Sequence, residues 1–287
     1  MKYRFIDRYR DLYRVEKLCR ALQVGRSGYY QWKQREKSRR ARENEALVME
    51  IKEIHKTHRQ VYGSPRITAE LRARGLGCGK NRVARLMREN GIRAKTKRRF
   101  KVTTDSRHSH PIAKNILDQN FVAYSPNKVW TSDITYVWTR EGWLYLAVVL
   151  DIFNRKIIGW SMKSRLTRDL VIDAFTMAVR GQRPGPGMIF HSDRGSQYAS
   201  NDFTEELKKY NCIQSMSGTG NCYDNSITET FFHTLKTELI YFERYRTRAE
   251  ARQSIFEYIE VFYNRIRRHS SLGYLSPVDF ERYIMAA

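Results

Sequence analysis

Val129-Trp-Thr-Ser-Asp-Ile-Thr-Tyr-Val-Trp138 is the stretch that decides the fold prediction. It is apolar and rich in β-branched and aromatic residues, which is typical of a strand. Further elements are expected after it: strands over 143–153 and 156–162, a helix over 167–180, a strand over 188–192, a helix over 200–210 and a strand over 213–217. Three successive strands followed by alternating helices and strands predict a mixed α/β sheet covered by helices on both faces.

Three acidic residues stand out because of where they lie in this pattern. Asp133 lies inside the first strand, where a carboxylate needs a partner or a cation. Asp193 follows the strand over 188–192, and Glu229 follows a loop rich in glycine and asparagine and opens an amphipathic helix. Residues at strand ends and at a helix start can converge on one edge of a sheet, as active-site residues commonly do.

Each of these acids also has a purely structural interpretation. Ser226 to Glu229 matches a capping box, in which the glutamate would bind only backbone N–H groups. Asp193 fits an ordinary turn. Asp133 has the weakest structural interpretation, because an aspartate inside a strand has little structural purpose. Taken jointly, and together with Lys236, the three acids favour a catalytic interpretation.

The chemistry that this set predicts is phosphoryl transfer. Asp133, Asp193 and Glu229 would supply oxygen ligands for two divalent cations, Mg²⁺ or Mn²⁺, which clamp the attacking and leaving oxygens of a phosphodiester. Asp193 and Glu229 are separated by 35 residues, and Lys236 lies seven positions beyond the glutamate. Seven residues are almost two helical turns, so Glu229 and Lys236 share one helix face. The lysine offers a point charge to a DNA phosphate.

The positive charge of the chain is concentrated in its N-terminal part. The formal net charge is +23. Residues 1–120 hold 32 Lys and Arg against 12 Asp and Glu, whereas residues 121–287 hold 21 against 18. This distribution indicates a nucleic-acid-binding region joined to a nearly neutral catalytic domain. A basic membrane-surface protein fits less well, because the basic part has no broad aromatic or leucine face.

Two helix-turn-helix candidates precede the catalytic region. The first spans Val15–Gln34. The second is better marked: a helix capped by Ser64 and followed by proline runs to about Arg74, glycines make the turn, and a second helix covers Lys80–Asn90. On that second helix the residues predicted to contact DNA are Lys80, Asn81, Arg82, Arg85 and Arg88. The alternative is a solvated basic surface. Arg98 and Arg99, in the basic run that follows, are expected to contact phosphates without reading sequence.

The predicted domain organisation follows from these assignments. It comprises a helical region with a possible helix-turn-helix over 1–45, a basic helix-turn-helix region over 46–104, a polar linker over 105–127, a catalytic core over 128–240, and a helical extension over 241–287 with a long amphipathic helix at 248–263. In the extension, Arg265, Arg267, Arg268 and His269 are expected either to contact DNA or to be exposed.

Other features narrow the class of protein. No transmembrane helix is predicted, since the longest clean apolar stretch is Leu144–Leu150, and the N-terminus has no hydrophobic signal core. The four cysteines are scattered, which suits reduced thiols in the cytoplasm. His55 and His58 have a plausible zinc-ligand spacing but no Cys-x-x-Cys follows them, so we expect a solvated helix face and no structural zinc.

Several motifs together resemble one known family. They are Trp130–Tyr136, His191–Tyr198, Gly220–Ser226, Glu229–Glu238 and Tyr263–Pro277, and the resemblance covers nearly the whole chain. The chain resembles the orfB-type transposases of bacterial insertion sequences, whose core is similar to retroviral integrases. The resemblance implies a ribonuclease-H-like core with Asp133, Asp193 and Glu229 as the metal-binding triad and Lys236 as an accessory DNA contact.

The same resemblance implies partners and location. Expected partners are double-stranded DNA, both the terminal inverted repeats and the target, further copies of the chain on DNA, and an upstream-frame product as a fusion or associated chain. The expected location is the bacterial cytoplasm at the nucleoid. Two alternatives to a transposase stay open: a structure-specific nuclease on the same fold, and a non-catalytic DNA-binding regulator, for which three convergent acids have no purpose.

Overall fold

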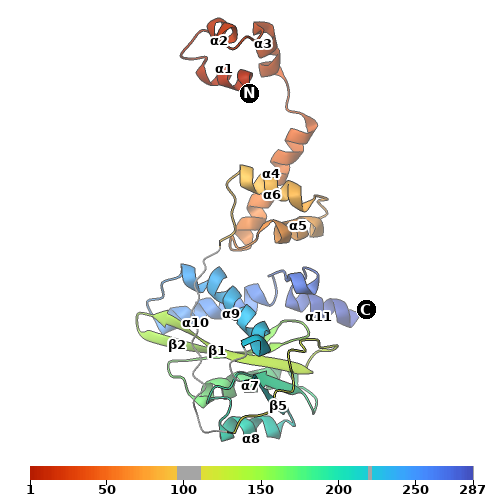
Figure 1. Cartoon of the computed structure of the whole chain (residues 1–287), viewed down its shortest axis with the longest axis vertical. Helices are drawn as coiled ribbons and strands as arrows, with labels where there is room; N and C mark the ends of the chain where they lie inside the picture. Colours follow the sequence, from red (N-terminus) through yellow and green to blue (C-terminus); the bar gives the residue numbers. More distant parts are fainter. Residues whose placement is uncertain (96–110, 219–221, 287) are drawn as a thin grey trace.

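The chain folds into two helical units followed by a core built on a single sheet (Figure 1). The structure, a computed structural model, describes residues 1–95, 111–218 and 222–286. Arg98 and Arg99, predicted to contact phosphates, lie outside the described residues. Within the described part of the chain, no helix is long and apolar enough to cross a membrane.

The sheet has five strands in the order β3-β2-β1-β4-β5. β1 (Val129–Thr139), β2 (Gly142–Asp151) and β3 (Ile157–Lys163) pair antiparallel, whereas β4 (Ile189–Ser192) and β5 (Ile213–Met216) run parallel to β1. The mixed α/β sheet predicted from the sequence is therefore confirmed, and its strands begin and end within a few residues of the expected positions.

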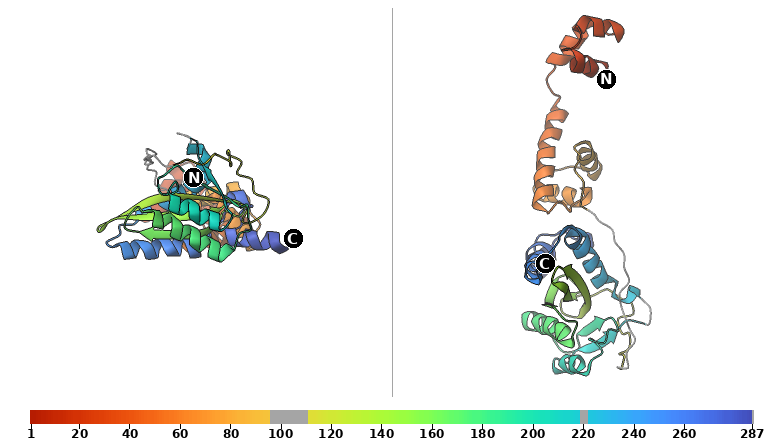
Figure 2. Two further views of the ribbon diagram at one scale, coloured as in Figure 1. Left: turned by 90° about the horizontal axis from the view of Figure 1, so that it is seen from below. Right: turned by 90° about the vertical axis from the view of Figure 1, so that its left-hand side faces the viewer.

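Helices cover both faces of this sheet (Figures 1 and 2). α7 (Arg168–Gln182) and α8 (Asn201–Lys209) lie on one face, and α9 (Ser226–Glu238) and α10 (Arg248–Phe256) lie on the other. Alternate residues of β2 contact the two layers: Ala147 and Val149 pack in the core on the α7 side, and Leu146 and Val148 pack in the core on the opposite side. Burial on both faces explains why β2 reads as a continuous apolar run.

The N-terminal region forms two separate helical units. α1 (Lys2–Tyr9), α2 (Val15–Ala21) and α3 (Arg26–Gln34) pack around Ile6, Cys19 and Tyr29. α4 (Arg39–Thr57), α5 (Ser64–Ala73) and α6 (Lys80–Glu89) form the second unit, here called the helix-turn-helix module, residues 39–95. The two predicted helices of this module are present as α5 and α6. One detail differs from the prediction: α5 has Gly63, not Ser64, at its N-cap position.

The C-terminal extension departs from a regular helix. The long helix expected over 248–263 is α-helical only in α10, and Glu257–Tyr263 winds as a π-helix. The chain then passes through a short 3₁₀ turn, Ser270–Leu272, to α11 (Pro277–Ala286). π-Helical turns, such as those of Glu257–Tyr263, occur often at functional sites. Here the π-helix buries the aromatic side chains of Tyr258, Phe262 and Tyr263.

Residues 111–127, which the sequence suggested as part of a linker, lie against the core. Leu117 is buried, and the backbone N–H groups of Ile116 and Leu117 donate to Ser215 Oγ at 2.9 and 3.2 Å. At the other end of this segment the N–H of Asn127 donates to Asp151 Oδ2 at 2.8 Å. The other oxygen of Asp151 accepts from the N–H of Phe153 at 2.9 Å, so this residue holds the turn that follows β2.

Asp151 leads to a prediction about the pH dependence of stability. Burial raises the pKa of this carboxyl to about 6. A raised pKa means that the folded state binds the proton more tightly, so the contribution of Asp151 is fully present below the unfolded pKa and is lost as the pH rises to about 6. In Asp151→Asn, urea unfolding should therefore give a smaller loss of stability between about pH 4 and pH 6.5 than in the original chain. Parallel pH profiles for the two proteins would contradict this.

Candidate active site

The register of two neighbouring strands brings the first two acids together. β1 and β4 run parallel, with Thr131 opposite His191. Asp133 and Asp193 each lie two residues beyond this pair. Because the two strands run in the same direction, both acids lie at the C-terminal end of β4. Asp133 is half-buried in β1, and the N–H of Ile134 donates to its Oδ1 at 2.7 Å.

Asp193 lies in a tight turn with Gly195. Its Oδ1 accepts from the N–H of Gly195 at 2.9 Å. A Cβ on Gly195 would meet this same oxygen at 3.1 Å and Gln197 Oε1 at 3.2 Å. The Asp-Arg-Gly sequence therefore leaves room for the carboxylate, and the turn interpretation and the catalytic interpretation of Asp193 are compatible.

Glu229 approaches the same edge from helix α9. Thr228, its neighbour, donates from Oγ1 to Thr131 Oγ1 on β1 at 2.8 Å, which fixes the start of the helix against the strand. The capping-box alternative does not hold: Asn225 is the N-cap residue and makes no side-chain cap. The glutamate lies exposed on the first turn of the helix.

The charges of the three acids act on one another. The pKa of Asp133 is raised well above its usual value, first by burial and then by repulsion from Asp193 and Glu229. The pKa of Glu229 is also raised, by partial desolvation of its carboxyl group and by repulsion from Asp193. Like charges raise one another's pKa in this way when they share a site.

The donor chemistry of this site fits a hard divalent cation. Three carboxylates offer the oxygen ligands that Mg²⁺ and Mn²⁺ prefer, and a cation would relieve their mutual repulsion. In residues 1–95, 111–218 and 222–286, however, no three His, Cys, Asp or Glu side chains already form a group that could hold a metal ion. In the described part of the chain, the three acids therefore do not form a closed coordination shell.

Comparisons with known proteins match both parts of the chain. Residues 123–222 and 229–284 match two family models described as integrase core domain, and residues 42–100 match one described as HTH-like domain. The transposase InsF for insertion sequence IS3A of Escherichia coli (strain K12) is 43% identical over 288 residues, which is 100% of both chains. The chain belongs to this family of insertion-sequence transposases. The ribonuclease-H-like integrase core predicted from the sequence is thereby confirmed, and with it the assignment as a polynucleotidyl transferase.

A second relative of the transposase comes from Shigella sonnei. This insertion element IS600 uncharacterized 31 kDa protein is 47% identical over 267 residues, 93% of this chain and 98% of the relative. Among solved structures, a simian T-cell lymphotropic virus intasome in complex with PP2A regulatory subunit B56 gamma has a TM-score of 0.48 and 16% identity, covering 80% of this chain and 74% of that one. A likeness of that size carries no functional argument, so the family assignment rests on the sequence matches.

Lys236 of the transposase lies where the sequence placed it, on the same helix as Glu229. Its side chain is half-buried, and burial lowers the pKa of its ammonium group, while Asp133 acts in the opposite direction. Conversely, Lys236 lowers the pKa of Asp133. The charge of the lysine and the carboxylate of Asp133 therefore act on each other.

Two buried polar residues near Asp133 and Asp193 could not be predicted from the sequence. Tyr198 is fully buried, and its hydroxyl lies 2.8 Å from Ser132 Oγ, which donates to the carbonyl of Val148. His191 is buried between Ser215 Oγ, 2.9 Å from its Nδ1, and Ser217 Oγ, 3.2 Å from its Nε2. Both residues belong to the His191–Tyr198 motif, so the only signal was a polar residue at each end of the segment carrying Asp193.

Asp224 connects two segments that are far apart in the sequence. Its two oxygens accept from Gln119 Nε2 at 3.0 Å, Asn115 Nδ2 at 2.9 Å and the N–H of Gly218 at 2.7 Å. The residue thus ties the segment over 111–120 to the turn just before the catalytic helix. Asn225 donates from Nδ2 to the carbonyl of Ser132 at 3.1 Å, next to Asp133.

The candidate DNA contacts of the module differ in how free they are. Lys80, Asn81 and Arg88 are exposed on α6. Arg82 donates to Asn44 Oδ1 at 2.9 Å and pairs with Glu43, and Arg85 pairs with Glu89 at 3.1 Å.

The basic residues of the C-terminal extension divide in the same way. Arg265 is exposed, as expected. Arg267 and His269 are buried, and Arg268 is held by contacts inside the molecule, so for these three the expectation of exposure was wrong.

Proposed function

We propose that this transposase carries out 3′-end cleavage at the ends of its insertion sequence and joins the exposed 3′-OH to target DNA. The observation that supports the proposal is the β1–β4 register, in which Asp133 and Asp193 each follow the Thr131–His191 pair by two residues. Water or a 3′-OH would be the nucleophile, so no covalent bond between protein and DNA is needed.

Asp133, Asp193 and Glu229 would hold two Mg²⁺ or Mn²⁺ ions. Bound there, the ions would activate the nucleophile and stabilise the leaving oxygen of the phosphodiester. The chain itself contributes the geometry. Tyr198 and Ser132 support the strand beneath Asp133, and the turn at Gly195 holds the carboxylate of Asp193.

Lys236 would position the DNA end. A half-buried ammonium beside the carboxylates presents its charge toward a phosphate bound at the same edge. Because the lysine shares α9 with Glu229, DNA contact and metal contact would come from one rigid element.

The helix-turn-helix module would bind double-stranded DNA at the terminal inverted repeats. Lys80, Asn81 and Arg88 of α6 are free to reach DNA at once, whereas Arg82 and Arg85 would first exchange their carboxylate partners for phosphates or bases. Arg98 and Arg99 would add phosphate contacts through charge alone.

This assignment predicts a graded effect on DNA binding. Lys80→Ala and Arg88→Ala should each weaken the affinity for element-end DNA and reduce the slope of log K against log salt by about one. Lys52→Ala, which removes an exposed lysine from α4, is the matched control and should leave the slope unchanged. Fluorescence anisotropy at several salt concentrations measures both quantities. Identical slopes for all four proteins would remove α6 from the DNA interface.

A strand-joining assay tests the proposed function as a whole. Labelled element-end DNA is incubated with Mg²⁺, target DNA and the transposase, with and without the upstream-frame product that we propose as a fused or associated partner. Joined product supports the proposal, and the size of the assembly on DNA shows whether several copies act together. Cleavage without joining under both conditions would favour a structure-specific nuclease. DNA binding without cleavage would favour a regulator. We place this activity in the bacterial cytoplasm, at the nucleoid.

A further inference from the structure

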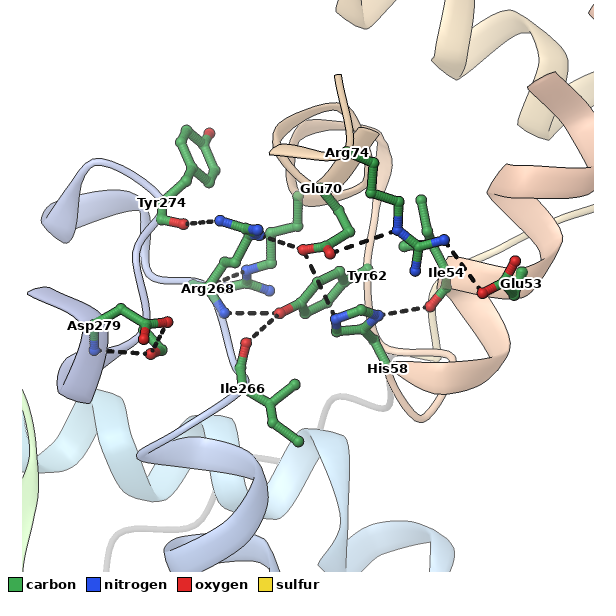
Figure 3. A network of polar contacts seen from close by, with 12 residues as sticks. Glu53, Ile54, His58, Tyr62, Glu70, Arg74, Ile266, Arg268, Tyr274 and Asp279 are labelled. Atoms are coloured by element: carbon green, nitrogen blue, oxygen red, sulfur yellow. Dashed lines mark hydrogen bonds and ion pairs between the residues drawn. The ribbon is translucent and has the colours of Figure 1, made fainter. Parts of the chain in front are cut away.

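The helix-turn-helix module contacts the C-terminal extension through residues that lie 198 to 206 positions apart in the sequence. Tyr62, fully buried at the end of the module's first loop, is at the centre (Figure 3). Its hydroxyl accepts from the N–H of Arg268 at 2.7 Å and donates to the carbonyl of Ile266 at 3.3 Å. The ring stacks on His58. His58 is buried, so the prediction of a solvated helix face was wrong for this residue.

Helix α5 of the module adds charged contacts to the same extension. Arg268 donates from Nε to Glu70 Oε2 at 2.5 Å and from Nη1 to the carbonyl of Tyr274 at 2.8 Å (Figure 3). Arg66, one turn before Glu70, donates from Nε to the carbonyl of Arg268 at 3.0 Å. One arginine of the extension is thus held by three residues of the module.

The network continues into the catalytic helix. Glu238, the last residue of α9, accepts from Arg267 Nε at 2.8 Å and from Arg267 Nη2 at 2.7 Å. The hydroxyl of Tyr258 donates to the same carboxylate at 2.8 Å, and Arg66 of the module lies 3.7 Å from it. The helix that carries Glu229 and Lys236 therefore ends inside the contact between the module and the extension.

Apolar packing and a peripheral ion pair accompany these polar contacts. Val61 and Tyr62 belong to one continuous buried cluster with Tyr258 and Phe262 of the π-helix. The guanidinium of Arg59 lies 5.3 Å from the ring centre of Phe262 and pairs with Glu257. The module is attached by a mixed apolar and ionic interface.

A buried ion pair adds little to the free energy of unfolding, because the desolvation of both charges offsets their attraction. Its effect here is on geometry. A purely apolar contact would let the module shift along the extension. The bidentate pair between Arg267 and Glu238 and the pair between Arg268 and Glu70 consist of directional hydrogen bonds, which form in one relative position. α9 is then fixed at both ends: Thr228 bonds Thr131 near its start, and Glu238 is bound at its end.

We propose that this docking network, defined by Tyr62, Arg66, Glu70, Glu238, Arg267 and Arg268, positions the helix-turn-helix module and the catalytic helix as one unit. DNA held by the module then reaches the active site in a single orientation. Glu70, Arg66 and Arg268 are positioning residues for strand joining, not DNA contacts. The inference rests on the proposed function, since it concerns how DNA is delivered to that site.

A charge swap in the full-length protein tests the network. Glu70→Arg places a second arginine beside Arg268, and Arg268→Glu places a second glutamate beside Glu70, so each single variant replaces attraction by repulsion. The double variant restores a pair of opposite charges. Each protein is assayed for affinity to element-end DNA, for the single-turnover joining rate, and for fold by circular dichroism. Small-angle X-ray scattering without DNA reports whether the module stays docked.

The single variants should bind DNA as the original chain does but join it about ten- to a hundredfold more slowly, since small misplacements of a reactant have effects of that size. Their scattering should show a more extended molecule. The double variant should recover both rate and compactness. Glu45→Arg, the same substitution on α4 at an exposed residue that pairs with Lys37 and lies outside the docking network, is the control and should join normally.

Folded single variants that join at the original rate, or a folded double variant no faster than the slower single one, would overturn the proposal. Should a single variant fail to fold, the peripheral pair provides the same test through Arg59→Glu, Glu257→Arg and their combination. If the original chain joins no DNA, the proposed function fails, and the scattering data alone still decide whether the network holds the module in place.

Discussion

Replacing Asp133 or Asp193 by asparagine, or Glu229 by glutamine, is expected to reduce cleavage and joining by more than about a hundredfold, since even outer-shell residues of metal sites contribute 10- to 100-fold. The amide keeps the shape of the side chain but loses the charge that holds a divalent cation. Affinity for element-end DNA should not change, because the module that binds the DNA is left intact. Joining assays and anisotropy measurements on the three variants check both statements.

Stability provides an independent view of the same three variants. The pKa of Asp133 is raised by burial and by its two acidic neighbours, so its charge opposes folding when no cation is bound. Asp133→Asn should therefore keep or raise the melting temperature of the metal-free protein while activity is lost. Asp202→Asn, at a surface acid of α8 that pairs with Arg168, is the control and should retain joining. An active Asp133→Asn protein would remove this residue from the triad.

Lys236→Ala is expected to slow end joining by about tenfold or more, because a mispositioned DNA end reacts slowly. Fold and cation binding should remain close to normal. If the lysine were only a surface charge, its loss would change stability by no more than about 0.5 kcal/mol and activity hardly at all.

Lys208→Ala is the matched control for Lys236→Ala. Lys208 is an exposed lysine on α8, outside the proposed site. Comparison of the single-turnover joining rates separates the two interpretations. Equal rates for the Lys236→Ala and Lys208→Ala proteins would reduce Lys236 to surface charge.

The sequence predicted the elements of the core because their signals are local. β1 and β2 are long apolar or β-branched runs, and burial on both faces leaves little ambiguity about them. Asp133 was recognisable because a carboxylate inside a strand is unusual. The seven-residue spacing of Glu229 and Lys236 sufficed to place both on α9, since helical geometry is regular.

Contacts between distant segments could not be predicted in this way. The sequence predicts Arg267 and Arg268 as DNA contacts or exposed residues, because nothing near them indicates Glu238 or Glu70 as partners. Nothing near Asp224 in the sequence indicates its partners Asn115 and Gln119, which lie more than 100 residues earlier. In both cases a polar side chain is buried by pairing across the fold, and such pairing leaves no periodic pattern.

A crystal of the transposase soaked in Mn²⁺ gives the most direct test of the central claim, that Asp133, Asp193 and Glu229 form one cation site. Anomalous scattering locates the ions independently of any assay. We expect Mn²⁺ peaks with metal–oxygen distances of about 2.0 to 2.5 Å to the carboxylates of all three residues. Mn²⁺ bound elsewhere, or bound without Glu229 in a protein that joins DNA, would contradict the proposal of a single site formed by the three acids.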